Sequence, residues 1–494
     1  MRARVPSHAR IHPMSEKNIP VSIQAGLAHH QAGRLSEAAA IYAAIPETSQ
    51  SFAQATYLLG MIAQDQAEHT RAITLFERAG KLSPREPVIA FQKAVSLNQA
   101  GLTEQAIESY QTALALNPNY VEAHCNLGNL LKRTGDKSGA IACYERALKI
   151  APQAAQIHYN LGVCHQDHFQ PERAIEYFRN AVRLNPTYAA AYNNLGVSLS
   201  EAGRAGEAIS CYRKAQKLEP DFAEAFYNLH ALVLNAEDLS EAIACLEKAY
   251  KIQPQNHSYR FFLGMLHDYA GHTDKAQALF SVSEGDALFK ADLDAWNYLK
   301  STTNYCATRS LPMIFGIAAR TFSYAMAHTN PDGLVMEFGV FNGKSIRQIA
   351  ALTHNTVHGF DSFEGIPEDW NHETSGSYST EGIIPEVPSN VTLHAGWFEN
   401  SIPKFIQQEN GPIRFMNIDC DLYSSTKTVL DVLAKQVVPG TVMVFDEYIG
   451  NISWREDEHK AFTEAAQTYG WKYEILSFSF VTKQVTVRIA SISP

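Results

Sequence analysis

The chain has 494 residues, a formal net charge of −10 at pH 7 and 46% hydrophobic residues. A chain of this length is too long to fold around a single hydrophobic core, so we expect at least two domains. The acidic balance and the lack of a basic tract argue against a dedicated nucleic-acid binder, and no apolar stretch is long enough to predict a membrane span.

The first 20 residues contain three arginines but no apolar run after them, so they do not resemble a secretory signal. We expect residues 1–20 to be a disordered leader, with Met14 as an alternative start. The seven cysteines form no CxxC pair and have no zinc-site spacing, which indicates reduced thiols and favours a cytoplasmic protein.

A period of 34 residues dominates residues 21–286. In the second period the repeated columns hold a small residue, Gly60, then Ala72, and then a large apolar residue, Phe76. Small residues let two helices approach closely, and we expect the aromatic side chain to fill the gap to the next hairpin. A proline that cannot continue a helix closes each repeat, at Pro84, Pro118, Pro152, Pro186, Pro220 and Pro254. The pattern resembles the tetratricopeptide repeat, in about eight copies, and predicts an all-α superhelix.

One further column holds an asparagine in four successive repeats, at Asn126, Asn160, Asn194 and Asn228. It resembles the asparagine ladder in the repeat arm of the O-linked N-acetylglucosamine transferases. The resemblance implies that an extended peptide or partner protein binds the concave face through these amides. The alternative is that each asparagine only bridges neighbouring helices. The column lapses at Leu58, Gln92 and Phe262, which restricts any groove to the middle repeats.

Residues 287–330 keep a helical apolar spacing but leave the repeat, and a breaker of Asn, Pro, Asp and Gly follows at 330–333. We therefore expect lead-in helices over 287–330 and a second domain over 331–494.

The second domain opens with a short apolar strand, Leu334–Phe338, followed by a glycine turn and a helix. The turn does not match the phosphate-loop motif, because Gly339 and Gly343 are separated by one residue too few. It does not match the dinucleotide-binding fingerprint either, because Phe341 stands where that motif has its second glycine. The turn resembles motif I of the class I S-adenosylmethionine-dependent methyltransferases. That resemblance implies that the methionine end of the cofactor is lined by Glu337, Gly339, Phe341, Gly343 and Ser345. An ordinary strand-to-helix turn is the alternative.

The next two strands also end in candidate cofactor residues. A strand over Thr356–Phe360 ends in Asp361, whose carboxylate can accept bonds from a ribose diol, and Ser362 can share that task. The alternative role for Asp361 is to cap the next helix. A strand over Val391–His394 leads to Gly396 and Trp397, candidates for the adenine pocket unless the tryptophan is a core residue.

Two acidic clusters follow two further strands. Ile413–Ile418 runs into Asp419 and Asp421, and Val442–Phe445 runs into Asp446 and Glu447. Four carboxylates at neighbouring strand ends repel one another unless a hard cation such as Mg²⁺ binds them. The ion would lower the pKa of a substrate hydroxyl, and a carboxylate outside the metal shell would take the proton. The alternative is that these acids cap helices or face solvent.

Five segments occur in the order found in the macrocin and mycinamicin O-methyltransferases: EFGVFNGKS, GFDSFEGIPEDW, AGWFENSIP, NIDCDLYSST and FDEY. This resemblance runs from about Pro331 to the C-terminus. It implies a Rossmann-like α/β fold, S-adenosylmethionine and Mg²⁺ as cofactors, a sugar hydroxyl as acceptor, and Asp419, Asp421, Asp446 and Glu447 as the metal-binding group. Which of Asp419 and Asp421 is the ligand and which the base stays open. The sequence departs from the family where Glu447 replaces the common aspartate and where the repeat arm is added.

Between the second and third strands, residues 363–388 are polar and rich in Gly, Pro and Ser, which indicates a mobile lid. Trp370, His372 and Tyr378 are its candidate substrate contacts. Two apolar runs, Tyr473–Val481 and Gln484–Ile489, predict a closing antiparallel hairpin.

The sequence thus predicts a repeat arm fused to an O-methyltransferase that acts on a sugar or glycoconjugate. The arm would capture a protein carrying that sugar, a partner enzyme or another copy of the chain. Two alternatives are an interaction scaffold whose second domain has lost its chemistry, and an enzyme that methylates a protein directly.

Overall fold

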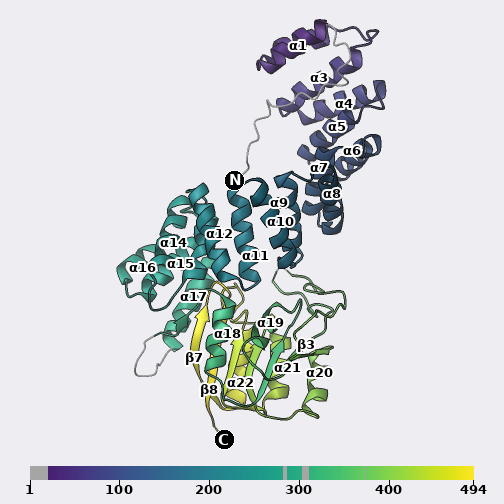
Figure 1. Ribbon diagram of the computed structural model, residues 1–494. Coiled ribbons are helices and arrows are strands. Elements are labelled where there is room, and N and C mark those ends of the chain that lie inside the picture. The colour runs from purple at the N-terminus through teal and green to yellow at the C-terminus, as the bar shows by residue number, and fades with distance from the viewer. Residues whose placement is uncertain (1–20, 282–285, 303–310, 372, 494) are drawn as a thin grey trace. The chain divides into compact units, whose positions relative to one another are not determined.

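The computed structural model describes residues 21–281, 286–302, 311–371 and 373–493. The predicted leader, residues 1–20, and the lid residue His372 lie outside this part of the chain. The described residues form a long series of helices followed by a domain built on one sheet (Figure 1). The predicted fold class, an all-α repeat region followed by an α/β domain, is confirmed.

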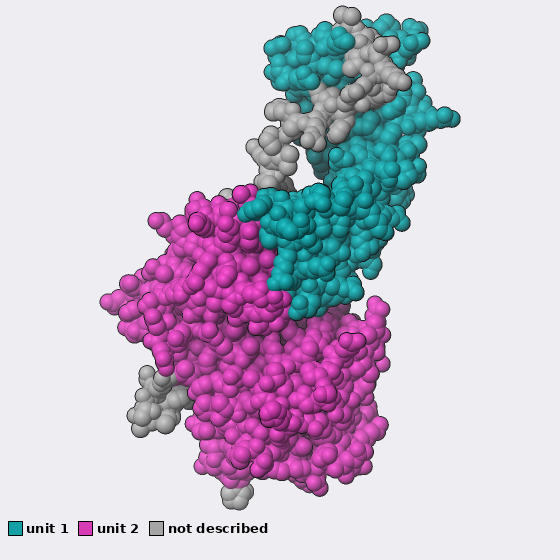
Figure 2. Space-filling view, viewed as in Figure 1, with its two compact units in different colours: residues 1–186 teal, residues 187–494 magenta. Residues whose placement is uncertain are grey.

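The chain divides into two compact units, residues 1–186 and 187–494 (Figure 2). The first unit contains α1 Val21–Gln31, α2 Leu35–Ala43, α3 Phe52–Asp65, α4 His69–Leu82, α5 Pro87–Gln99, α6 Thr103–Leu116, α7 Val121–Arg133, α8 Lys137–Ile150, α9 Ala155–Asp167 and α10 Pro171–Leu184. Six more repeat helices open the second unit: α11 Ala189–Glu201, α12 Ala205–Leu218, α13 Ala223–Val233, α14 Ser240–Ile252, α15 His257–Tyr269 and α16 Thr273–Phe280.

The glycine column of the repeats packs against the aromatic column of the same hairpin. A Cβ atom added to Gly162 on α9 would lie 2.6 Å from the ring of Phe178 on α10. The same contact recurs in α11 and α12, where a Cβ on Gly196 would lie 2.6 Å from Tyr212. The aromatic ring therefore fills space within its own hairpin, rather than only the gap to the next hairpin as the sequence suggested, and the glycine is needed for that approach.

The sheet has eight strands in the order β1-β7-β8-β6-β5-β2-β3-β4. Its strands are β1 Met313–Ile314, β2 Leu334–Phe338, β3 Val357–Asp361, β4 Val391–Ala395, β5 Ile413–Ile418, β6 Val437–Phe445, β7 Trp471–Ser479 and β8 Gln484–Ile492. All neighbours are parallel except β8, which is antiparallel to both β6 and β7. The carboxyl ends of β2, β3, β5 and β6 therefore meet at one edge, where ligands of open α/β sheets bind.

Alternating side chains on the strands bury both faces of the sheet. Val335 packs in a cluster with α18 (Ala318–Ala327) and α19 (Lys344–Ala350), whereas Met336 packs in another with residues of α20 (Phe398–Ile406), α21 (Tyr423–Leu433) and α22 (Glu458–Thr468). Burial on both faces is typical of parallel strands and explains why β2 and β5 are mostly apolar.

Within the second unit, the last repeats share a hydrophobic core with the sheet. One buried cluster joins Phe261 of α15, Trp296 of α17 (Ala287–Thr302) and Phe478 of β7. The ring of Phe261 meets that of Phe480 edge to face, with centroids 5.0 Å apart. The last two repeats are therefore part of the sheet domain's core.

Polar contacts reinforce this junction. Arg320 Nη1 on α18 donates to the carbonyl of Leu234 at 2.8 Å, and the hydroxyl of Tyr269 on α15 donates to the carbonyl of Pro312 at 2.8 Å. The end of α13 thus contacts α18, and the end of α15 contacts the residue just before β1.

The shared core predicts that a cavity in the arm loosens the sheet. Phe261→Ala should cost about 3–5 kcal/mol, as expected for a buried phenylalanine, and should speed amide hydrogen exchange in β7 and β8. Phe76→Ala is the matched control, because Phe76 is also 0% exposed but packs in a cluster confined to the first unit. Equal exchange in β7 and β8 for both variants would show that the cores are separate.

Candidate functional site

The glycine turn follows β2 and touches the end of β5. Gly339 has φ +89°, and a Cβ atom there would lie 1.7 Å from the carbonyl oxygen of Asp419. The Gly339 N–H donates to Phe360 at 2.9 Å, and the Asp419 N–H donates to Phe338 at 2.8 Å. Only glycine allows this approach, which brings the predicted cofactor turn beside the first acidic cluster.

Asp361, at the end of β3, binds the glycine turn through its side chain. Its Oδ2 atom accepts the N–H groups of Val340 and Phe341 at 2.7 Å each, and Oδ1 accepts the N–H of Phe363 at 2.6 Å. Phe341 has φ +48°, which a non-glycine residue seldom adopts. Asp361 therefore holds the turn in shape, and a ribose contact would use its remaining lone pairs.

Glu337 lies inside the sheet on β2, with 0% of its surface exposed. Its Oε1 atom accepts an N–H of Asn417, its register partner on β5, at 2.8 Å. Burial raises the pKa of Glu337 to about 8, while the neighbouring side chains of Ser345 and Asn417 act in the opposite direction. In the described structure neither Glu337 Oε2 nor Asn417 Oδ1 has a hydrogen-bond partner. Two buried acceptors next to each other thus have no donor.

The other predicted cofactor residues lie around the same edge. Gly343 has φ +79° and forms the N-cap of α19. The Ser362 hydroxyl donates to the carbonyl of Gly365 at 3.2 Å, and the N–H of Gly396 donates to the carbonyl of Asp361 at 2.9 Å. Trp397 is half-buried at the N-cap of α20. The predicted ribose and adenine contacts are therefore neighbours.

The two acidic clusters follow β5 and β6, which pair in parallel. Burial raises the pKa of Asp419 well above its usual range, and the charges of Asp446, Asp421 and Glu337 raise it further. Burial, followed by the charge of Glu447, raises the pKa values of Asp421 and of Asp446 to about 7. The backbone of Asp421 is left-handed, with φ +61°. The sheet thus brings the carboxylates close enough to perturb one another, in a strained loop.

Glu447 differs from the three aspartates because it is already paired. Both of its carboxylate oxygens accept bonds from the ammonium of Lys483, at 3.1 and 3.0 Å. Gln484 Nε2 donates to Asp446 Oδ1 at 2.5 Å. Lys483, in the turn before β8, and Gln484, the first residue of β8, were not identified as site residues from the sequence, because only the folded hairpin brings them to the end of β6.

The aspartates have the donor chemistry of a Mg²⁺ site but not its geometry. Carboxylate oxygens are the ligands that Mg²⁺ prefers, and a cation would offset both the burial and the mutual repulsion that raise the pKa values of these aspartates. Among the described residues, however, no three His, Cys, Asp or Glu side chains converge to hold a metal ion. The oxygen ligands of Asp419, Asp421 and Asp446 are of the type that binds this ion. Glu447 instead forms an ion pair with Lys483.

Glu458, the first residue of α22, is another acid that sequence reasoning missed. It is 0% exposed, and its two carboxylate oxygens accept the N–H groups of Cys420 and Glu447 at 3.3 Å each. It therefore joins the loops after β5 and β6. An acid at a helix start is common, so the sequence offered no signal for this contact.

The segment predicted as a lid contains no helix or strand in its described residues. Several hydrogen bonds anchor it: the hydroxyl of Ser424 donates to Glu368 at 2.6 Å, the hydroxyl of Ser453 donates to Asn371 at 3.1 Å, and Arg347 on α19 donates to the carbonyl of Glu386 at 2.9 Å. Burial, followed by the charge of Asp421, raises the pKa of Tyr378 to about 12. Tyr378 thus lies near the acids, and its ring is 6.0 Å from that of Phe341.

The four asparagines of the repeat column are partly exposed, on α7, α9, α11 and α13. Asn160 accepts a bond from Gln156 at 3.0 Å, and Asn126 has a side-chain hydrogen bond with Tyr110. In the second unit, Asn193 donates to Asn194 at 3.3 Å and accepts from Asn228 at 3.0 Å. Of the column, Asn228 on α13 thus bonds to the preceding repeat through Asn193 on α11.

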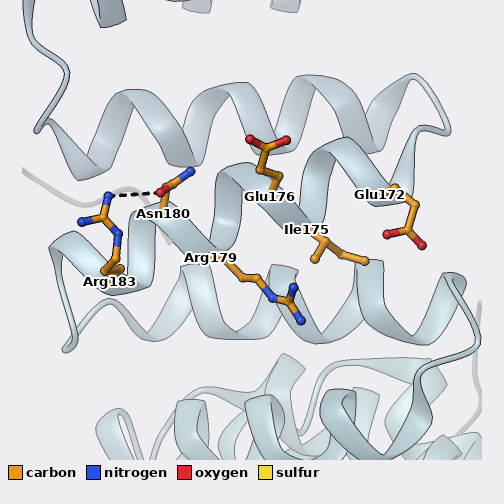
Figure 3. Close-up of a pocket in the computed structure, with 6 residues that line it drawn as sticks. All are labelled: Glu172, Ile175, Glu176, Arg179, Asn180 and Arg183. Carbon is orange, nitrogen blue, oxygen red and sulfur yellow. Dashed lines mark hydrogen bonds between the residues drawn. The ribbon is translucent and has the colours of Figure 1, made fainter.

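The first unit also contains a hollow of about 280 Å³ on α10 (Figure 3). Its lining residues are Glu172, Ile175, Glu176, Arg179, Asn180 and Arg183. All six belong to one helix, and Arg183 donates to Asn180 at 3.1 Å. None of them belongs to the asparagine column or to the acidic clusters.

Comparisons with known families agree with these two regions. A family model described as a methyltransferase domain matches residues 336–448. Models of the tetratricopeptide repeat match residues 96–135, 121–153, 155–188, 189–222 and 223–256. The chain therefore carries tetratricopeptide repeats followed by a methyltransferase domain, as the sequence predicted.

Two curated relatives match short stretches. Human protein O-mannosyl-transferase TMTC1 is 32% identical over 77 residues, which cover 15% of this chain and 9% of the relative. The TPR repeat-containing thioredoxin TTL4 of Arabidopsis thaliana is 30% identical over 77 residues, covering 16% and 11%. The chain thus spans about a tenth of the length of these relatives.

Two similar solved structures are repeat proteins. YrrB, described as a TPR protein with an unusual peptide-binding site, is 26% identical, with a TM-score of 0.33, over 40% of this chain and 97% of that one. The C-terminal part of a TPR protein from Cytophaga hutchinsonii is 17% identical, with a TM-score of 0.40, over 46% of this chain and 93% of that one.

In the described ranges, every helix is too short or too polar to cross a membrane.

Proposed function

We propose that this methyltransferase-domain protein transfers a methyl group from S-adenosylmethionine to a hydroxyl of a sugar or glycoconjugate, with Mg²⁺ at the acceptor. The observation that carries the proposal is that the acids following β5 and β6 lie beside Glu337 and the glycine turn. The charges of Asp446, Asp421 and Glu337 all raise the pKa of Asp419. Acids in this arrangement suit a cationic cofactor and a hydroxyl that must lose a proton.

The cofactor proposal is supported by the two buried acceptors without donors, Glu337 Oε2 and Asn417 Oδ1. The ammonium group of S-adenosylmethionine is a charged N–H donor of the kind that these oxygens lack. Further along the edge, Asp361 would accept the ribose hydroxyls, and Gly396 and Trp397 would contact adenine. The bond from Gly396 to Asp361 supports this order along the cofactor.

When bound, S-adenosylmethionine supplies the activated methyl carbon and Mg²⁺ lowers the pKa of the acceptor hydroxyl. Asp446 and one of Asp419 and Asp421 would hold the ion. The other of Asp419 and Asp421 would be the base that takes the proton of the hydroxyl. With its pKa raised to about 7 by burial and by Glu447, Asp421 can accept a proton near neutral pH.

Methyl transfer from isotopically labelled S-adenosylmethionine into a host lysate tests this function, with Mg²⁺ present or removed by a chelator. We expect label in a sugar-containing fraction and its loss on chelation. Absence of cofactor binding by calorimetry would favour an interaction scaffold instead. Labelling of protein that is insensitive to the chelator would favour direct protein methylation.

We further propose that the protein is cytoplasmic and that its repeat arm recruits a partner through the asparagine column. The partner is a protein that carries the acceptor sugar, another enzyme or a second copy of the chain. An amide row can bind an extended peptide backbone. Replacing Asn126, Asn160, Asn194 and Asn228 by alanine in the full chain should lower transfer to the natural acceptor while sparing a small sugar acceptor. Asn119→Ala, at an exposed loop site, is the control. Equal loss on the small acceptor would contradict a recruiting role.

A further inference from the structure

The turn between β7 and β8 supplies a positive charge to the acidic cluster. The ammonium of Lys483 donates to both oxygens of Glu447, at 3.1 and 3.0 Å. Its backbone has φ +56°, a left-handed conformation that a lysine seldom adopts. A Cβ atom on Gly450 would lie 2.9 Å from Lys483 Cγ, so the lysine stem packs on the loop after β6. The position of Lys483 is therefore set by its backbone conformation, by the packing of its stem on Gly450 and by the ion pair with Glu447.

The same loop is held from the other side through its main chain. Glu458, fully buried on α22, accepts the N–H of Glu447 at 3.3 Å with one oxygen and the N–H of Cys420 at 3.3 Å with the other. One carboxyl thus ties the loop after β6 to the loop after β5. A buried side chain whose polar atoms are hydrogen-bonded fixes local geometry more firmly than packing alone.

We propose that Lys483 and Glu458 are positioning residues that fix the acidic loop after β6. Lys483 is the resident cation on the side chain of Glu447, and Glu458 anchors its main chain to the loop carrying Asp419 and Asp421. Glu447 then serves to position the loop and does not bind the metal. The three aspartates are the acids that remain available to the ion and the acceptor. The expected kinetic effect rests on the proposed methyl transfer, whereas the expected rigidity of the loop does not.

Lys483→Met tests the charge, because methionine keeps an unbranched stem over Gly450 but removes the ammonium. We expect kcat to fall about 10–100-fold, as for other groups that orient an active site from behind, with the KM for S-adenosylmethionine unchanged. Amide hydrogen exchange over residues 446–451 should speed up. Lys483→Arg should restore most of both. Lys472→Met, at an exposed position on β7, is the matched control.

Glu458→Gln tests the main-chain anchor, because the amide keeps the size of the carboxyl but turns one of its two acceptors into a donor. Exchange should speed up over both 419–421 and 446–451, whereas Glu456→Gln, at an exposed neighbour, should change neither.

Unchanged exchange over 446–451 in Lys483→Met would overturn the proposal, as would a loss that Lys483→Arg does not restore, because packing rather than charge would then matter. If the wild-type chain transfers no methyl group, the proposed function fails. The exchange measurements still support or overturn the positioning role in that case.

Discussion

Replacement of Glu337 by glutamine is expected to weaken S-adenosylmethionine binding about 10–100-fold, because a charge-assisted hydrogen bond to a buried group contributes about 1.5–3 kcal/mol. Glu337 has one oxygen bonded to Asn417 at 2.8 Å and one without a donor in the described structure. Binding an ammonium there requires the ionised carboxylate, so the wild type should release a proton on binding below pH 8. Calorimetry in two buffers of different ionisation enthalpy measures this release, which the variant should lack.

The same substitution should stabilise the free chain at alkaline pH. Burial raises the pKa of Glu337 from 4.5 to about 8, so the folded state binds the proton more tightly than the unfolded state. Stability therefore falls as pH rises from about 4.5 to about 8, by an amount on the order of a few kcal/mol. Glutamine does not titrate. Its advantage in melting temperature over the wild type should be small at pH 5 and full at pH 9.

Asp292→Asn is the matched control for Glu337→Gln. Asp292 is also buried, and burial raises its pKa to about 7, opposed by the charge of Lys483; it lies on α17, not on β2 or the glycine turn. It should gain stability at alkaline pH in the same way and leave cofactor affinity unchanged. If Glu337→Gln bound S-adenosylmethionine as tightly as the wild type, Glu337 would be a core acid and would not be part of a cofactor site.

Gly339→Ala should be strongly destabilising, by several kcal/mol. The left-handed backbone costs an alanine about 1–2 kcal/mol. A Cβ atom would also lie 1.7 Å from the carbonyl oxygen of Asp419, and this neighbour is backbone. The ends of β2 and β5 must then separate, which moves the glycine turn away from the first acidic cluster. Melting temperature, soluble yield and cofactor binding should all fall.

Gly376→Ala separates backbone strain from steric overlap. Gly376 has φ +88°, almost the value of +89° at Gly339, but a Cβ atom there would meet nothing within 4 Å. This variant should lose only about 1–2 kcal/mol and should keep cofactor binding. Similar behaviour of the two variants would mean that the contact between Gly339 and Asp419 does not matter to the fold.

Local patterns in the sequence predicted much of this fold. The runs Leu334–Phe338 and Ile413–Ile418 correspond to β2 and β5 residue for residue, because strands buried on both faces read as continuous apolar segments. The predicted fifth strand began at Val442, whereas β6 begins at Val437. Pro439 and Gly440 look like a turn, and the pairing with β5 tolerates them through a shift in register.

Features that depend on distant parts of the chain could not be predicted. The two residues of β1 form a strand only because β7 lies beside them. Lys483 reaches Glu447 across 36 positions, and Glu458 reaches Cys420 across 38. Neither residue type is unusual where it stands, so only folding reveals the contact. The acids of the candidate site were found because each follows a recognisable strand.

The core shared by α13–α17 and the sheet also constrains how the protein can change over evolutionary time. Gain or loss of one 34-residue unit among the earlier helices would alter the length of the arm and leave the core of the methyltransferase domain intact. The same event within α13–α16 would remove Phe261 and its neighbours from the core that they share with the sheet. Variation in repeat number is therefore expected at the N-terminal side of the array, with the last two repeats inherited together with the sheet.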